Sequence, residues 1–128
     1  MREITKVLKV LSDESRLRVL NLLQERECCV CEVMQAMCIS QSKASRILSA
    51  LYDAGLLRLR REGRWALYSI DSEGIEEYMK DILAGVSRRL NGDPLAAQDR
   101  EKLKQAKRVG PGCIGAREGS VALDADGL

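Results

Sequence analysis

Histidine and phenylalanine are both absent from this sequence of 128 residues. Without histidine, a site for a soft metal must take its ligands from cysteine sulfur, with carboxylates as secondary candidates. The sequence does not open with the basic and then apolar segments of a secretory signal, and its apolar runs are far too short to span a bilayer. These features favour a cytoplasmic protein without a membrane partner, in which thiols stay reduced.

Four of the five cysteines lie in one short stretch, CCVCEVMQAMC, at residues 28–38. A chain of this length can bury a sufficient core without disulfides, so the cysteines are not needed as staples. In a reducing compartment, clustered cysteines more often bind metals or take part in redox chemistry. Cys28, Cys29 and Cys31 therefore form a candidate sulfur site, whereas the isolated Cys38 is expected to be structural.

Hydrophobic spacing predicts helices over residues 2–11, over a segment after SDES, over 27–37 and from Gln41 to about Gly55. Two strands, LLRLR and WALYSI, are joined at REGR, and a long helix follows with an apolar stripe over 75–90. This order indicates a mainly α fold with a small β-hairpin wing, a winged helix-turn-helix, over residues 1–92. Residues 93–128 form a charged and then glycine-rich C-terminal extension, predicted to be partly flexible, with a possible helix near 95–108.

Polar and basic residues on the fourth predicted helix and on the hairpin indicate binding to double-stranded operator DNA. Side chains of this kind at the start of a recognition helix reach base edges, and basic hairpin tips suit phosphates. Arg60 also lies in the hairpin, close to its basic tip. The predicted DNA-contacting residues are Gln41, Ser42, Lys43, Ser45, Arg46, Ser49, Arg61 and Arg64.

The first and last predicted helices carry apolar stripes larger than a small wing domain can cover. A two-fold homodimer buries such stripes and places two recognition helices on successive half-sites. The predicted dimer interface consists of Ile4, Val7, Leu8, Leu11, Tyr78, Met79, Ile82, Leu83 and Val86.

Four segments, LSDESRLRVLNLL, ECCVCEV, SQSKASRILSALYDAGLL and REGRWALYSI, together resemble the ArsR/SmtB family of dimeric winged-helix repressors. The Cys-Val-Cys element, here Cys29 to Cys31, resembles that of the arsenical-responsive branch. The resemblance implies a repressor that occupies operator DNA until arsenite or antimonite binds its thiolates. Well-known members have a third cysteine three residues later, where this sequence has Met34. The family's zinc sites on the last helix use histidines, which are missing here.

The third thiolate ligand is left open between Cys113 and Cys28. A helix N-terminus lowers thiol pKa values, so residues 28–31 are expected to favour the thiolate. Residues i and i+2 of a regular helix point to nearly opposite sides, so a shared ion is expected to distort the first turn and move the recognition helix.

Three other functions remain as alternatives. A repressor of the same fold can respond to oxidants or reactive sulfur through its clustered thiols. An enzyme with a nucleophilic cysteine is less favoured, because no histidine is available as a base and no convincing anion-binding loop follows a cysteine. A structural zinc module is also less favoured, because CCVC lacks the CxxC spacing of zinc ribbons.

Overall fold

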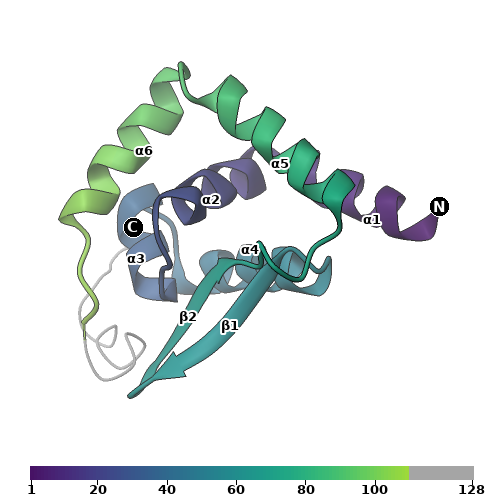
Figure 1. Ribbon diagram of the computed structural model, residues 1–128. Helices are drawn as coiled ribbons and strands as arrows, with labels where there is room; N and C mark the ends of the chain where they lie inside the picture. The colour runs from purple at the N-terminus through teal and green to yellow at the C-terminus, as the bar shows by residue number, and fades with distance from the viewer. Residues whose placement is uncertain (110–128) are drawn as a thin grey trace.

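Six helices and one hairpin make up residues 1–109, the part of the chain that the computed structural model describes (Figure 1). The predicted order of helices, hairpin and further helices is confirmed. In chain order the elements are α1 (Arg2–Leu11), α2 (Glu14–Glu25), α3 (Val30–Met37), α4 (Gln41–Asp53), β1 (Leu57–Glu62), β2 (Trp65–Ile70), α5 (Glu77–Leu90) and α6 (Pro94–Gln105).

Three of the helices begin at a side chain that caps their first turn. Such a cap accepts a hydrogen bond from a backbone N–H that has no partner within the helix. Asp13 caps α2, Ser40 caps α4 and Asp93 caps α6, with the proline of α6 at the start of its first turn. The capped N–H groups belong to Arg16 at 3.0 Å, Lys43 at 3.1 Å and Ala96 at 3.0 Å.

The apolar core lies where α2, α3 and α4 meet, with α5 above them in Figure 1. Its largest fully buried side chains include Leu20, Leu22, Leu48, Leu51 and Leu56. Burial of each such side chain contributes about 1.5–3 kcal/mol, so this region dominates the stability of the fold. It also fixes α3 against α4, the two helices of the helix-turn-helix.

The antiparallel hairpin β1–β2 forms the wing. Its register pairs Leu57 with Ile70 at the base and Glu62 with Trp65 at the tip. The two-residue connection contains Gly63 at a φ of 60°, the left-handed conformation that short hairpin loops require. The hairpin extends away from the helices in Figure 1, so its far end is available for a partner.

The predicted start of the third helix is wrong. We expected a helix from Glu27, but α3 begins at Val30. Cys28 instead pairs with β2: its N–H donates to the Tyr68 carbonyl at 3.0 Å, and the Tyr68 N–H donates to the Cys28 carbonyl at 2.8 Å. The segment before α3 is therefore an extension of the wing sheet.

Helix α6 folds back over α2 and α3 after a turn at residues 91–92. The Arg18 guanidinium donates two hydrogen bonds to the buried Asp99 carboxylate, at 2.8 and 2.9 Å. The Asn21 amide donates to the Ala96 carbonyl at 3.2 Å, which ties α2 to the start of α6. Within residues 1–109, no helix is long and apolar enough to cross a membrane.

Candidate functional site

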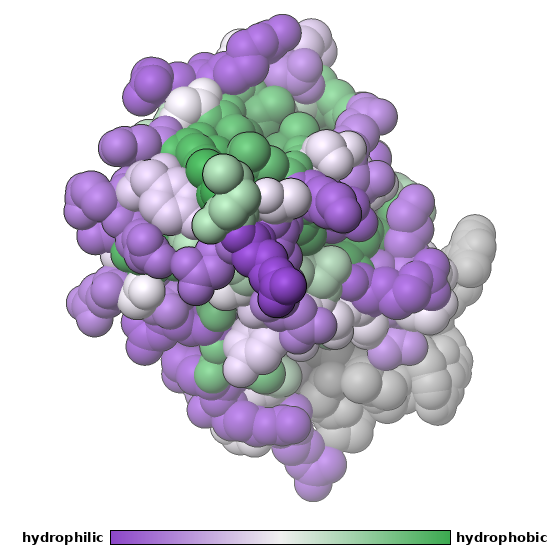
Figure 2. Space-filling model, turned by 90° about the vertical axis from the view of Figure 1, so that its right-hand side faces the viewer, coloured by the Kyte–Doolittle hydropathy of each residue, from purple (hydrophilic) through white to green (hydrophobic). Residues whose placement is uncertain are grey.

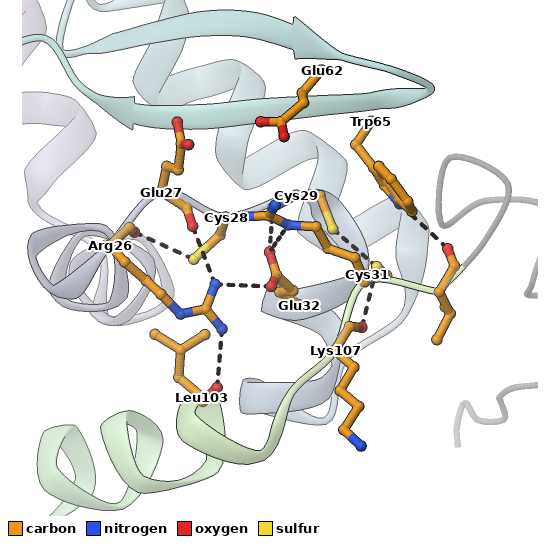
Figure 3. Close-up of polar contacts among 12 residues, drawn as sticks. Arg26, Glu27, Cys28, Cys29, Cys31, Glu32, Glu62, Trp65, Leu103 and Lys107 are labelled. Atoms are coloured by element: carbon orange, nitrogen blue, oxygen red, sulfur yellow. Dashed lines mark hydrogen bonds and ion pairs between the residues drawn. The ribbon is translucent and has the colours of Figure 1, made fainter.

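Cys29 and Cys31 bring their sulfur atoms to within 2.9 Å of each other at the start of α3 (Figure 3). Cys29 is the N-cap residue, in an extended conformation with φ −93° and ψ 173°, and Cys31 lies in the first helical turn. The expectation that the two side chains point to opposite sides is wrong, because it assumed helical geometry at both positions. The two sulfurs therefore lie next to each other without any unwinding of α3, and Cys31 is itself disulfide-bonded.

The sulfur pair, Cys29 and Cys31, lies in a small apolar cluster apart from the main core. Leu67 of β2 is buried in this cluster, and Met34 and Trp65 pack against it. Cys29 is 2% exposed and Cys31 is 4% exposed, so the two sulfurs are shielded from bulk water. Met34 occupies the position where the arsenical-responsive branch has its third cysteine, and its thioether-bearing side chain contacts this cluster.

Cys28 belongs to a different environment from its neighbour. Its side chain is fully buried in the main core, and its thiol donates to the Arg26 carbonyl at 3.5 Å. Figure 3 shows its sulfur pointing away from the sulfur pair. We expected Cys38 to be a structural residue of the core. It is instead exposed at the C-terminal end of α3, with a φ of 57°.

Glu32 is a buried carboxylate beside the sulfur pair, with three positively polarised partners. It accepts hydrogen bonds from the Cys29 N–H at 2.9 Å and from Arg26 at 2.8 Å, and Arg108 donates to it at 3.2 Å. The Glu32 N–H faces the Cys29 sulfur, which completes a capping box in which cysteine replaces serine or threonine. Burial alone would raise the pKa of Glu32, but these partners outweigh it and lower that pKa.

The thiol pKa values shift opposite to the direction expected from the helix N-terminus. Burial raises the pKa of Cys28 to about 12, with the negative charge of Glu32 adding to the effect. Burial also raises the pKa of Cys29 to about 11, even though the Glu32 N–H at the helix start lowers it. The cost of burying a thiolate therefore exceeds the benefit of the helix N-terminus, and these thiols are protonated at neutral pH.

Residues 107–109, which we call the strap, cross α3 next to the sulfur pair after α6 has ended. The Lys107 carbonyl lies 3.8 Å from the Cys31 sulfur and accepts a hydrogen bond from the Gln35 amide at 2.7 Å. The Trp65 indole N–H donates to the Val109 carbonyl at 3.5 Å. Cys113, the other candidate ligand, lies outside the described residues. Within those residues, no group of three or more His, Cys, Asp or Glu side chains is placed to hold a metal ion.

Sequence reasoning missed the roles of Glu32, Gln35 and Trp65. The position of Glu32, three residues after Cys29, is the spacing of a capping box, which would have indicated the true helix start. Gln35 and Trp65 carry no such signal, because their partners lie far away in the sequence.

The polar stripe of α4 lies on the surface as predicted for a recognition helix. Ala44, Ile47 and Leu48 on the opposite face are buried. Gln41 and Ser45 are partly exposed and joined by a hydrogen bond of 3.3 Å between their side chains. The exposed members of the stripe are Ser42, Lys43, Arg46 and Ser49.

The wing presents its basic residues unequally. Arg61 and Arg64 are exposed near the hairpin end. Arg60 instead forms ion pairs with Glu27 and Glu62, and its hydrogen bonds to Glu27 lower the pKa of that carboxyl. Arg60 therefore ties the wing to the segment that leads into the sulfur pair, and its charge is already compensated.

The predicted dimer residues divide into two groups. Val7, Leu11, Met79 and Leu83 are buried within the protomer. Leu8 is 50% exposed, and Ile4, Tyr78, Ile82 and Val86 are partly exposed. Figure 2 shows the side of the molecule on which α1 lies. Apolar surface gathers in the upper half of this view and is surrounded by hydrophilic side chains. The second group is thus the accessible part of the predicted interface.

Comparison with known proteins identifies regulators of one family. The model of the family described as "Bacterial regulatory protein, arsR family" matches residues 13–58. The arsenic resistance transcriptional regulator ArsR1 of Pseudomonas putida KT2440 is 41% identical over 90 residues, which cover 67% of this chain and 70% of that protein. The arsenical resistance operon repressor of Escherichia coli K12 is 44% identical over 63 residues, 48% of this chain and 54% of that protein.

Solved structures agree with the sequence matches. HlyU from Vibrio cholerae has a TM-score of 0.60 at 26% identity, over 69% of this chain and 91% of that one. The homodimeric winged helix-turn-helix DNA-binding domain of Mb0332 from Mycobacterium bovis has a TM-score of 0.60 at 29% identity, over 73% of this chain and 82% of that one. The predicted winged helix-turn-helix fold is confirmed, and the chain belongs to the ArsR family of bacterial DNA-binding transcriptional regulators.

Proposed function

We propose that this protein is a dimeric repressor that leaves its operator DNA when trivalent arsenic or antimony binds Cys29 and Cys31. The observation that carries the proposal is the sulfur pair, buried and 2.9 Å apart, at the start of the helix that precedes α4. Two sulfur atoms held together in an apolar site suit a thiophilic ion, once Cys31, which is disulfide-bonded in the structure, has been reduced. The arsenic-resistance regulators of P. putida and E. coli named above support the same inducer.

The protonated state of Cys29 suits a neutral metalloid that binds after Cys31 has been reduced. When arsenous acid exchanges its three hydroxyl groups for three thiols, each arsenic–oxygen bond is replaced by an arsenic–sulfur bond. Each thiol proton leaves with a hydroxyl group as water, so arsenic stays trivalent and no net proton is released. A divalent cation must instead displace the thiol protons, which the raised pKa of Cys29 opposes. The site therefore favours the trivalent metalloid.

Cys113 is the third ligand in this proposal. Cys28 is disfavoured, because its sulfur points into the main core and contacts the Arg26 carbonyl. Cys113 follows the strap, whose Lys107 carbonyl lies 3.8 Å from the Cys31 sulfur. Cys113 lies four positions after Val109 in the sequence.

Release from DNA follows from the elements that surround the sulfur pair. Leu67 and Trp65 of the wing pack on the two sulfurs, and α3 is joined to α4 by a short turn. An ion bonded to both sulfurs thus acts on the wing strand and on the helix-turn-helix together. A swing from 99:1 to 1:99 in occupancy needs about 5.5 kcal/mol of differential binding, which sulfur–metalloid bonds can supply.

Recognition of DNA is assigned to α4 and the wing tip. Gln41, Ser42, Lys43, Ser45, Arg46 and Ser49 face the major groove in this proposal, with Arg61 and Arg64 on phosphates or in the minor groove. The exposed basic and polar side chains of both elements support this assignment.

The test is binding of reduced protein to operator DNA, measured by fluorescence anisotropy with and without arsenite. We expect tight binding without arsenite and release with it. Cys38→Ser is the matched control, because Cys38 is exposed and lies at the other end of α3; it should release normally. Release by peroxide but not by arsenite would overturn the proposal in favour of a thiol-based redox sensor.

A further inference from the structure

Tyr52 and Leu59 are large apolar side chains that the fold leaves in contact with water. Within residues 1–109, the exposed large apolar side chains are Met1, Leu8, Tyr52, Leu59 and Val109. Leu8 belongs to the predicted dimer interface, and Met1 and Val109 stand at the two ends of that range. Tyr52 is 45% exposed and Leu59 is 42% exposed, so both gain free energy when a partner covers them.

Tyr52 continues the polar stripe of α4. It follows Ser45 by seven residues and Ser49 by three, and these spacings keep side chains on one face of a helix. The helix ends just beyond it, where the Gly55 N–H donates to the Tyr52 carbonyl at 2.9 Å. Gly55 has a φ of 86°, and β1 begins two residues later. The stripe that we assign to DNA therefore ends in an aromatic ring at the turn into the wing.

Leu59 lies on the hairpin face that packs against the helices at its base. Leu57, two residues earlier on this face, is buried in the main core. The hairpin then extends away from the helices (Figure 1), and Leu59 is exposed. Its cross-strand partner is Tyr68, so the side chains of this pair share the face. Arg61, two residues further along β1, is exposed on the same face, which thus changes from apolar to basic toward the tip.

The phenol of Tyr68 links the end of α4 to this face of the wing. The pKa of Tyr68 is raised, mainly by burial and then by the Tyr52 phenol, while the positive charge of Arg61 opposes the rise. Electrostatic effects weaken with distance, so Tyr52 and Arg61 both lie near Tyr68. An aromatic, an aliphatic and a cationic side chain thus gather in the corner between helix and hairpin. We call Tyr52, Leu59, Arg61 and Tyr68 the corner cluster.

The corner cluster lies where a sugar–phosphate strand passes in a complex with DNA. The recognition helix enters the major groove, and the wing contacts phosphates or the adjacent minor groove. Because a sugar–phosphate backbone separates the two grooves, the corner between the two elements faces that backbone. A tyrosine suits this partner, since its ring packs on deoxyribose and its hydroxyl donates to a phosphate oxygen. The guanidinium of Arg61 adds a charge complementary to phosphate.

We propose that Tyr52 and Leu59 contact one sugar–phosphate segment of the operator, where the Tyr52 hydroxyl donates to a phosphate and Leu59 packs on the deoxyribose. This contact sets the depth of α4 in the groove and the angle of the wing, because it lies where the two elements meet. Phosphate contacts of this kind fix register without reading sequence. The inference rests on the assignment of α4 and the wing to DNA in the proposed function, and it is independent of the inducer.

The test compares Tyr52→Phe, Tyr52→Ala and Leu59→Ala with the wild-type protein, on a duplex that the wild type selects from random DNA. Tyr52→Phe removes one hydrogen bond to a charged group, so affinity should fall about tenfold on selected and on random duplexes alike. Tyr52→Ala should lose more, and Leu59→Ala should lose about threefold through its smaller apolar contact. The salt slope should keep its wild-type value, because none of these variants changes a charge.

Single methylphosphonate substitutions in the duplex identify the contacted phosphate. A methylphosphonate replaces one charged phosphate oxygen by a methyl group. At the contacted position it should weaken wild-type binding about tenfold more than it weakens binding of Tyr52→Phe, because the variant has already lost the hydrogen bond. At all other positions the two proteins should lose equally, which provides the internal control. Equal losses at every phosphate would overturn the contact, since a purely structural role of Tyr52 singles out no phosphate.

Wild-type affinity in all three variants would also overturn the proposal. Failure of the DNA assignment itself has a different signature, in which Arg46→Ala and Arg64→Ala leave operator binding unchanged as well. If these two arginine variants keep their effects while the Tyr52 and Leu59 variants bind like the wild type, α4 and the wing contact DNA but the corner cluster does not.

Discussion

The first turns of α3 and α4 have similar N-cap residues but differ in burial: the first is buried and the second is largely exposed to solvent. Each has a short polar side chain at the N-cap: the thiol of Cys29 in α3 and the hydroxyl of Ser40 in α4. Around Cys29 the neighbours are buried and hydrogen-bonded to one another. After Ser40 the side chains of Ser42 and Lys43 are left open to solvent. The proposed function accordingly places the ligand of α3 inside the protein, whereas the polar groups of α4 are open to an external partner.

The largest effect should come from Cys29→Ser. Serine is a favoured N-cap residue, so α3 should form as before and operator binding should persist. The hydroxyl is too hard a ligand for a soft ion, so arsenite should no longer release the DNA. Operator anisotropy with increasing arsenite measures this, and Cys31→Ser should behave alike. Normal release by either variant would show that the sulfur pair is not the sensor.

Leu8→Glu should disrupt the dimer, which affects DNA binding through α4 but not the sulfur pair of α3. Leu8 is half exposed on α1, where a carboxylate would be buried without a partner on association. We expect a monomer by sedimentation, with tight operator binding lost because one recognition helix reaches one half-site. Arsenite binding at the sulfur pair should persist in this monomer, since Cys29 and Cys31 belong to one chain. A wild-type protein that is itself monomeric at micromolar concentration would contradict this prediction.

Cys28 provides a pH test within the sulfur-rich segment. Its pKa rises from about 9 to about 12 in the fold, so the native state retains a proton that the unfolded chain loses. This contribution to stability is fully present below pH 9 and is lost as the pH rises toward 12, by up to about 1.4 kcal/mol per unit. Denaturant unfolding of the wild type and Cys28→Ala at pH 8 to 11 measures the difference. Equal slopes would contradict it, and Cys28→Ala should still respond to arsenite.

Arg46→Ala should affect only the recognition helix. Arg46 is exposed on the polar stripe of α4, where a guanidinium can read a guanine edge. We expect a loss of about 1–3 kcal/mol in operator affinity and a relaxed preference at one base position. Binding to a set of single-base operator variants measures both. Unchanged affinity and preference would mean that this face does not contact bases.

The smallest effect should come from Arg64→Ala at the wing tip. A phosphate contact weakens all sequences alike, so the variant should reduce the salt slope of binding by about one. Arg60→Ala is the matched control, because Arg60 is already paired with Glu27 and Glu62. A control that flattens the salt slope as much as Arg64→Ala would show that the ion pairs open on DNA.

Patterns carried by neighbouring residues were predictable from the sequence. The start of α4 at Gln41 and the hairpin connection at REGR depend on a few neighbouring residues, and both predictions were confirmed. The start of α3 was not predictable in this way, because Cys28 pairs with Tyr68, which lies 40 residues later. The direction of the thiol pKa shifts depends on burial by β2 and the core, which also comes from distant parts of the chain.

The sulfur pair has one property that the sequence predicted and one that it did not. The Cys-Val-Cys spacing was enough to select Cys29 and Cys31 as candidates. Their mutual distance depends on the extended conformation of Cys29, which Glu32 and the pairing of Cys28 enforce. The strap was invisible in the sequence, because an exposed glutamine such as Gln35 gives no indication of its backbone partner.

The two hydrogen bonds between Cys28 and Tyr68 have a consequence for local unfolding. Because the segment before α3 is hydrogen-bonded to β2, the wing cannot detach from the helices without breaking both bonds. The amide protons of Cys28 and Tyr68 should then exchange with solvent deuterium at one common rate, set by a shared opening event. The wing and the entrance to the sulfur site would thus behave as one cooperative unit, whose opening free energy native-state exchange can measure directly.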